Sequence, residues 1–248
     1  WGITAWAFYA IPTVPVAYML FVNKSPMMKI SGACEAALPL KGRKPLSKLI
    51  DVVIALGIVG GTSTSLGLGV PLVSAMVSEL LGIPDLLMTK LFVLLFWLAL
   101  FGASAYRGLK KGIKVLADIN MVLAAITLLF ILLAGPTLFI LSISVNSVGM
   151  LADNFIRMST WMDPVTKSGF PEAWTVFYWA WWIAYAAFVA LFIGRISKGR
   201  TIRQLVLGVI GWGTLGTTLF LAIIGGYGVY LESTGQLPLS DMLTESGM

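Results

Sequence analysis

Histidine is absent from the 248-residue chain, and cysteine occurs once, at Cys34. These absences exclude metal sites built from histidine and cysteine, a histidine-ligated haem, acid–base catalysis by histidine and an internal disulfide. Charged residues are scarce as well, at 11% of the chain, where a soluble domain carries roughly 25%. Because 58% of the residues are hydrophobic and the mean hydropathy is +0.91, we predict an all-α polytopic membrane protein.

Acidic residues are missing from the middle of every apolar stretch. A buried ionisable group would be a functional site by default, so this absence argues against a carboxylate proton relay. A nucleophile–base pair is also missing there, which makes a membrane enzyme the least favoured class. We expect Asp51 and Asp118 to lie in the first turns of helices, where a carboxylate stabilises the helix dipole. A bound cation would then be held by aromatic rings, backbone carbonyls or hydroxyls.

Six apolar stretches are long enough to cross a bilayer, which takes about 20 residues. Pro12 and Pro15 are expected to kink the first of them. A fragment of a longer protein is expected, since the chain begins at Trp1 without Met and is apolar from the start. The six predicted spans are at about 1–22, 49–81, 86–106, 113–143, 174–196 and 202–230.

Residues 146–161 follow the fourth span and have apolar residues near helical spacing, with polar ones between them. This pattern predicts a short amphipathic helix. It would lie at the membrane interface or, as an equally favoured alternative, in an oligomer contact.

Basic residues are concentrated in alternate loops. The positive-inside rule places these loops in the cytoplasm, and the same asymmetry explains the net charge of +6. Nucleic-acid binding is therefore an unnecessary hypothesis. Fourteen of the 17 basic residues follow the first, third and fifth spans: Lys24, Lys29, Lys41, Arg43, Lys44, Lys48, Arg107, Lys110, Lys111, Lys114, Arg195, Lys198, Arg200 and Arg203.

Glycine and hydroxyl residues interrupt the second span between Gly60 and Gly69. The hydroxyls of residues 62–65 and the flexible glycines are typical of a broken helix that lines an ion site. Close packing of helices through small residues uses the same composition, and the spacing favours this second interpretation slightly.

An aromatic run occupies residues 174–185, with four Trp, two Tyr and one Phe in twelve positions. On a helix, Tyr178, Trp182 and Tyr185 share one face. A second aromatic set lies near the start of the chain and includes Trp6 and Tyr9. Converging rings would form a box suited to a quaternary ammonium, which cannot donate hydrogen bonds. An interfacial belt or ordinary core packing are the alternatives.

These motifs carry a resemblance to a known family. Residues 174–182, followed by the basic segment 195–203, resemble the signature on the eighth helix of the betaine/choline/carnitine transporters. Residues 61–69 resemble the fifth helix of that family, and residues 1–9 resemble the fourth. The resemblance implies a twelve-helix, LeuT-like inverted-repeat fold, a homotrimer and a bacterial inner-membrane location.

By this resemblance the chain covers helices four to nine. Residues 1–143 would hold helices four to seven of the first repeat, and residues 144–173 an extracytoplasmic amphipathic helix and loop. Residues 174–248 would hold helices eight and nine, the first two of the second repeat. Helices one to three and ten to twelve would lie outside this sequence.

The resemblance also implies a function, secondary active transport of an onium solute such as glycine betaine by alternating access. Choline, carnitine and dimethylsulfoniopropionate present a similar head group. The implied substrate-binding residues are Trp1, Trp6, Tyr9 and Trp182, with Trp181 and Tyr185 as further candidates and Phe177 and Trp179 as weaker ones.

Sodium is the implied coupling ion, and no cofactor is expected. Thr62 and Phe188 match one sodium site of the family, although Ile58 stands where that site has a second hydroxyl. Sodium-independent carnitine exchangers carry Met where Val189 stands and Arg where Asn120 stands, so sodium symport is favoured. A carnitine/γ-butyrobetaine antiporter is one alternative, and a non-transporting onium sensor is an alternative of another class.

Overall fold

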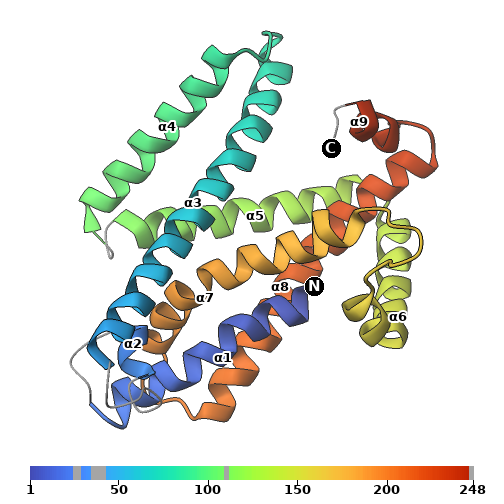
Figure 1. The fold of residues 1–248 in the computed structure, drawn as a ribbon. Coiled ribbons are helices and arrows are strands. Elements are labelled where there is room, and N and C mark those ends of the chain that lie inside the picture. Colours follow the sequence, from blue (N-terminus) through green and yellow to red (C-terminus); the bar gives the residue numbers. More distant parts are fainter. Residues whose placement is uncertain (25–28, 35–42, 109–111, 246–248) are drawn as a thin grey trace. The chain divides into compact units, whose positions relative to one another are not determined.

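The computed structural model describes residues 1–24, 29–34, 43–108 and 112–245, and every element in these ranges is helical (Figure 1). Lys41, Lys110 and Lys111 of the predicted basic loops lie outside them. The elements are α1 (Gly2–Phe21), α2 (Ile30–Ala33), α3 (Arg43–Leu81), α4 (Leu87–Tyr106), α5 (Lys114–Ala134), α6 (Thr137–Thr160), the π-helical segment η3 (Pro171–Val176), α7 (Phe177–Ile196), α8 (Ile202–Ser233) and α9 (Leu239–Glu245).

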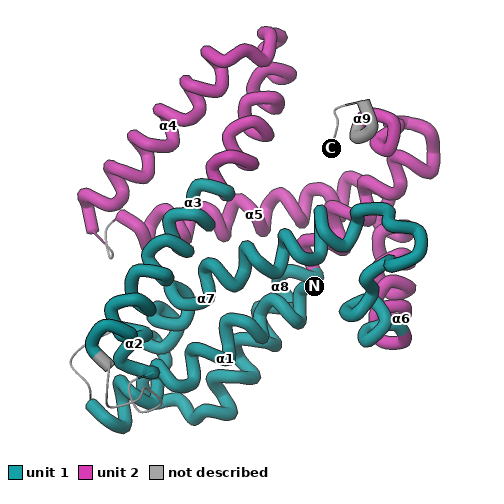
Figure 2. The backbone as a smooth tube through the Cα atoms, in the orientation of Figure 1, with its two compact units in different colours: residues 1–64, 154–218 teal, residues 65–153, 219–248 magenta. Residues whose placement is uncertain are grey.

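The chain forms two compact units (Figure 2). The first comprises residues 1–64 and 154–218, and its core lies where α1 packs on α7. Gly194 of α7 permits this approach, since a Cβ there would lie 2.7 Å from Val16 of α1. In the second unit, residues 65–153 and 219–248, α6 packs on α8 through the fully buried Ile140 and Gly226.

Seven described helices are long and apolar enough to cross a membrane, where six spans were predicted. The predicted fourth span, 113–143, is wrong at its far end because α5 stops at Ala134. Gly135 is extended, with φ −88° and ψ −169°, as expected for a residue that precedes a proline. A new helix, α6, then begins at Thr137.

The segment 146–161 is not a short separate helix, because most of it is the second half of α6. Ser142 and Ser144, which precede this segment, do not end the helix. Ser144 donates its hydroxyl to the Ile140 carbonyl one turn earlier, at 2.5 Å. The hydrogen-bonding capacity of this side chain is therefore met within the helix. The interfacial position of this segment stays a prediction.

Helix α3 is continuous over 39 residues, so the less favoured interpretation, a broken helix between Gly60 and Gly69, is wrong. Close packing through small residues, the favoured interpretation, agrees with the position of Gly61 against Tyr185 of α7. Thr62 and Thr64 donate their hydroxyls to carbonyls four residues earlier, at 2.7 and 3.0 Å, which keeps the polar stretch helical. At 1.5 Å per residue α3 is about 58 Å long, and a bilayer core is only about 30 Å thick.

The predicted helix-dipole role of Asp51 and Asp118 is also wrong, because neither lies in a first turn. Helix α3 begins at Arg43 and α5 at Lys114, so both carboxylates come after the first turn. Asp51 instead lies 3.9 Å from the Lys29 ammonium.

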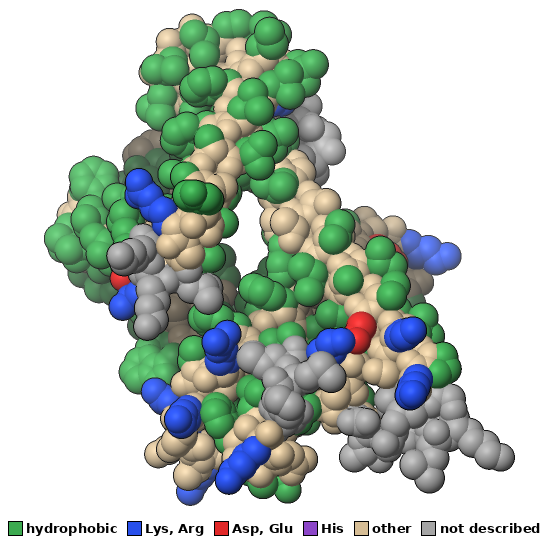
Figure 3. All heavy atoms as spheres, turned by 90° about the vertical axis from the view of Figure 1, so that its left-hand side faces the viewer, with side chains coloured by type: hydrophobic (Ala, Val, Ile, Leu, Met, Phe, Trp, Pro, Cys, Tyr) green, Lys and Arg blue, Asp and Glu red, His purple; other side chains and the backbone are tan. Residues whose placement is uncertain are grey.

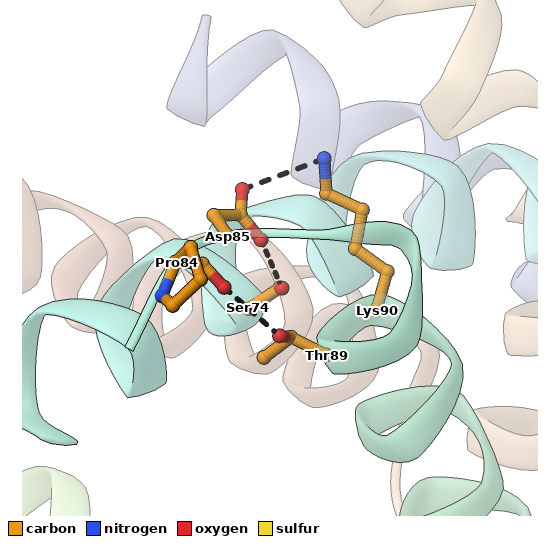
Figure 4. Close-up of polar contacts among 5 residues, drawn as sticks. All are labelled: Ser74, Pro84, Asp85, Thr89 and Lys90. Atoms are coloured by element: carbon orange, nitrogen blue, oxygen red, sulfur yellow. Dashed lines mark hydrogen bonds and ion pairs between the residues drawn. The ribbon is translucent and has the colours of Figure 1, made fainter. Parts of the chain in front are cut away.

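A polar cluster fixes the turn between α3 and α4 (Figure 4). The Ser74 hydroxyl donates to the Asp85 carboxylate, and the Lys90 ammonium lies 3.4 Å from the same group. The Ser74 bond and then Lys90 hold the pKa of Asp85 below its ordinary value. Asp85 therefore stays ionised at neutral pH and ties the two helices together at this turn.

Much of the exterior is apolar, and Figure 3 shows hydrophobic side chains over a large part of one face. Large residues such as Leu80 and Trp212 are 82% and 76% exposed. A soluble monomer rarely exposes contiguous apolar patches of more than a few hundred Å². This surface suits lipid or further helices.

Gly61 of α3 provides a test of the packing inside the first unit. A Cβ at Gly61 would lie 3.1 Å from the Tyr185 ring of α7, whereas one at Gly60 would meet nothing within 4 Å. We expect Gly61→Val to destabilise the whole protein by about 1–3 kcal/mol through overpacking. Thermal unfolding in detergent measures this effect. Gly60→Val is the matched control for helix propensity, and equal losses in the two variants would contradict this packing.

Candidate functional site

Helix α7 carries the aromatic run from Phe177 onward, and the start of the run lies in the preceding segment η3. Pro171 opens η3, where a proline needs no backbone N–H partner, and the chain then continues as α7 from Phe177 to Ile196. Uncharged side chains fill the helix up to Arg195, so its apolar surface can lie within a membrane. Trp174 and Glu172 belong to η3 rather than to α7.

Three predicted residues meet at the contact of α1 with α7. The rings of Tyr9 and Trp182 are 4.6 Å apart between centroids and tilted by 34°. Trp6 lies at 5.4 Å from Trp182 and 5.6 Å from Tyr9, edge-on to both. Tyr9 is buried, with 8% of its surface exposed. We call Trp6, Tyr9 and Trp182 the ring triad.

Further rings extend the ring triad along α7. Tyr178 lies 5.8 Å from Trp182, and the predicted residue Trp1 stacks on Tyr178 at 5.4 Å. Trp1 also stacks on Phe170 at 6.2 Å. Trp1 therefore joins the ring triad through Tyr178 and does so without a direct ring contact of its own to Trp182.

The loop before η3 places Phe170. The Asp163 carboxylate accepts the Ser168 N–H at 2.9 Å, and Gly169 adopts the left-handed φ of +76° that glycine tolerates. Hydrogen bonds from the Ser168 hydroxyl and N–H lower the pKa of Asp163 from its ordinary value. The ionised carboxylate thus organises the turn that brings Phe170 to Trp1.

The other predicted aromatic residues point to different neighbours. Trp181 packs on Phe177 at 5.9 Å, and Trp179 packs on Phe8 at 5.9 Å. Tyr185 lies against Gly61 of α3. Their roles in substrate binding stay predictions, and the ring partners of Trp179 and Trp181 are Phe8 and Phe177 rather than members of the ring triad.

The predicted sodium ligands have separate surroundings. The Thr62 hydroxyl donates to the Ile58 carbonyl at 2.7 Å, and Phe188 is 53% exposed. Within the described ranges, no three His, Cys, Asp or Glu side chains gather as a metal site. A sodium ion here would have to use hydroxyl and carbonyl oxygens, which hard cations accept.

Three residues that the prediction left out of the site contact its rings. Tyr178 was predicted to share a helical face with Trp182, but it was not among the implied substrate-binding residues. No helical spacing in the sequence linked Phe170 or Thr217 to these rings. Thr217 of α8 accepts the Trp6 indole N–H at 2.9 Å from 211 positions away in the sequence.

An uncharged cluster of rings between membrane-crossing helices can stabilise a cation through the negative faces of the rings. The fold and site thus define a multi-pass helical membrane protein with an aromatic candidate site for an onium group. The model of the family described as "BCCT, betaine/carnitine/choline family transporter" matches residues 1–248. The chain belongs to this family, which comprises transporters and not enzymes.

Bacterial relatives are similar over the whole chain. The glycine betaine transporter OpuD of Bacillus subtilis is 38% identical over 99% of this chain and 48% of its own length. A carnitine transporter of Acinetobacter baumannii is 34% identical over 99% of this chain and 45% of its own length. The transporter YeaV of Escherichia coli is 32% identical over 100% of this chain and 51% of its own length. The chain therefore spans about half the length of these relatives.

Proposed function

We propose that the whole protein is a secondary transporter of an onium solute such as glycine betaine, and that the ring triad binds the onium head. The observation that carries this proposal is the meeting of Trp6, Tyr9 and Trp182 between two apolar helices. Two relatives named as glycine betaine and carnitine transporters support the class of solute.

The attraction between the onium head and the three rings is partly offset by the contacts that the rings lose. A desolvated cation gains up to about 2 kcal/mol from each ring, so the triad supplies about 2–6 kcal/mol before ordering costs. The triad rings contact one another at 4.6–5.6 Å between centroids. The head group must therefore part these rings, and each ring pair gives up about 0.5–1.5 kcal/mol. For three ring pairs this cost is about 1.5–4.5 kcal/mol and offsets most of the gain, so the ring triad alone gives only weak, reversible binding.

The remaining parts of the proposal concern coupling and assembly. Alternating access in a twelve-helix, LeuT-like inverted-repeat fold would move the solute past the ring triad. Sodium symport is favoured because Val189 and Asn120 occupy the positions where sodium-independent exchangers carry Met and Arg. Trp1, Trp181 and Tyr185 are proposed to line the pathway, Thr62 and Phe188 to contribute to the sodium site, and the protein to form homotrimers.

Removal of one triad ring tests the site. In proteoliposomes, we expect Trp182→Ala to raise the half-saturating concentration of glycine betaine by about tenfold or more, because one desolvated ring is lost. Trp182→Phe should have a smaller effect, since a phenyl face remains. Trp212→Ala removes an indole that is 76% exposed and serves as the control. Uptake that is unchanged in Trp182→Ala would overturn the assignment of the ring triad.

Sodium dependence tests the coupling. Uptake of labelled glycine betaine and carnitine should require an inward sodium gradient. Thr62→Val, which removes a hydroxyl ligand, should raise the sodium concentration for half-maximal uptake. Rapid exchange of either solute in sodium-free buffer would instead establish an antiporter. Saturable binding without any flux would establish an onium sensor.

A further inference from the structure

Helix α8 is linked to the ring triad by a hydrogen bond. The Trp6 indole donates its N–H to the Thr217 hydroxyl oxygen at 2.9 Å. Thr217 in turn donates its only hydroxyl proton to the Gly213 carbonyl of its own helix at 3.0 Å. Because that proton is committed, the oxygen lone pairs are free to accept from the indole. The hydroxyl is thus oriented as an acceptor for Trp6.

Steric contact fixes the same indole from the same helix. A Cβ on Gly213 would lie 2.2, 2.5 and 2.6 Å from the Cδ2, Cε2 and Cε3 atoms of Trp6. Only glycine leaves room for the ring at this position. Gly213 and Thr217 are one helical turn apart and therefore lie on one face of α8. Together they form a seat for the Trp6 ring.

We propose that Thr217 and Gly213 are positioning residues that hold Trp6 at the angle which onium binding requires. This inference rests on the proposed function of the ring triad. The attraction of a cation is directed at the face of a ring, so a rotated indole would present its positive edge instead. The seat fixes the Trp6 ring before the solute arrives, so that Tyr9 and Trp182 are the rings that move when the head group enters, and the ordering cost of Trp6 is removed from the binding step.

The seat also explains the part that α8 plays in the arrangement of the ring triad. Tyr9 and Trp182 contact Trp6 edge-on, at 88° and 70°, and such contacts alone leave the indole N–H without a partner. A half-buried donor without an acceptor is unfavourable, so the indole would turn to find one. Thr217 supplies the acceptor at the angle that keeps the triad together.

The experiment measures equilibrium binding and sodium-driven uptake of glycine betaine by the whole transporter. We expect Thr217→Val, which keeps the shape but loses the acceptor, to weaken binding about three- to tenfold. Thr217→Ser should restore wild-type binding. Thr218→Val, at the next position of α8, is the matched control. The maximal uptake rate and the half-saturating sodium concentration should stay unchanged, since a general loss of structure would lower the rate as well.

A second pair of variants tests the steric half of the seat. Gly213→Ala should weaken binding at least as much as Thr217→Val, because the new methyl displaces the ring. Gly216→Ala is its control, as a Cβ there would meet nothing within 4 Å. If Thr217→Val does not fold, Thr217→Ala makes the same test of the acceptor.

A double-mutant cycle separates the possible outcomes. In a Trp6→Phe background, which has no indole N–H, Thr217→Val should cause no further loss of affinity. Wild-type affinity in Thr217→Val, together with lost binding in Trp182→Ala, would overturn the seat alone. An equal loss from Thr217→Val in both backgrounds would also overturn it. Wild-type protein that binds no glycine betaine or carnitine would overturn the proposed function, and the seat with it.

Discussion

The contact between α1 and α7 is the interaction on which the rest of the site depends. Val16 lies against Gly194, and the tilted rings of Tyr9 and Trp182 pack with 4.6 Å between centroids. These contacts bring two distant segments of the chain close enough for their rings to meet. A cation between these apolar helices finds no carboxylate on either of them, so ring faces, together with carbonyl and hydroxyl oxygens, are the available sources of negative potential.

Polar groups around the rings have structural roles that leave the ring faces uncharged. Asp163 organises the loop that places Phe170 against Trp1, and Thr217 accepts the N–H of Trp6. Thr13 donates its hydroxyl to the Tyr9 carbonyl within α1. Each of these hydrogen bonds satisfies a buried or half-buried polar group, as an apolar environment demands. The same arrangement suits the proposed ligand, a cation that donates no hydrogen bonds.

Much of the architecture could be predicted from the sequence because membrane spans are long and apolar. The aromatic run on α7 and the partners Trp6 and Tyr9 were also found in advance, through helical spacing and family resemblance. The predicted helix ends were wrong where polar residues lie within a helix or where a proline follows a glycine. Serine and threonine hydroxyls bonded to their own helices keep α3 and α6 intact, whereas Gly135 before Pro136 ends α5. Thr217 was beyond prediction, since nothing in its own neighbourhood on α8 indicates a partner on α1.

The charge of the solute is the direct test of this account. Glycine betaine and tert-butylacetate have nearly the same shape, but a carbon replaces the onium nitrogen in the second. In an equilibrium competition assay on the whole transporter, tert-butylacetate should bind at least about tenfold more weakly, because a neutral head loses the attraction of the ring faces. Equal competition by the two compounds would contradict a cation–π site and would leave the ring triad as an ordinary apolar pocket.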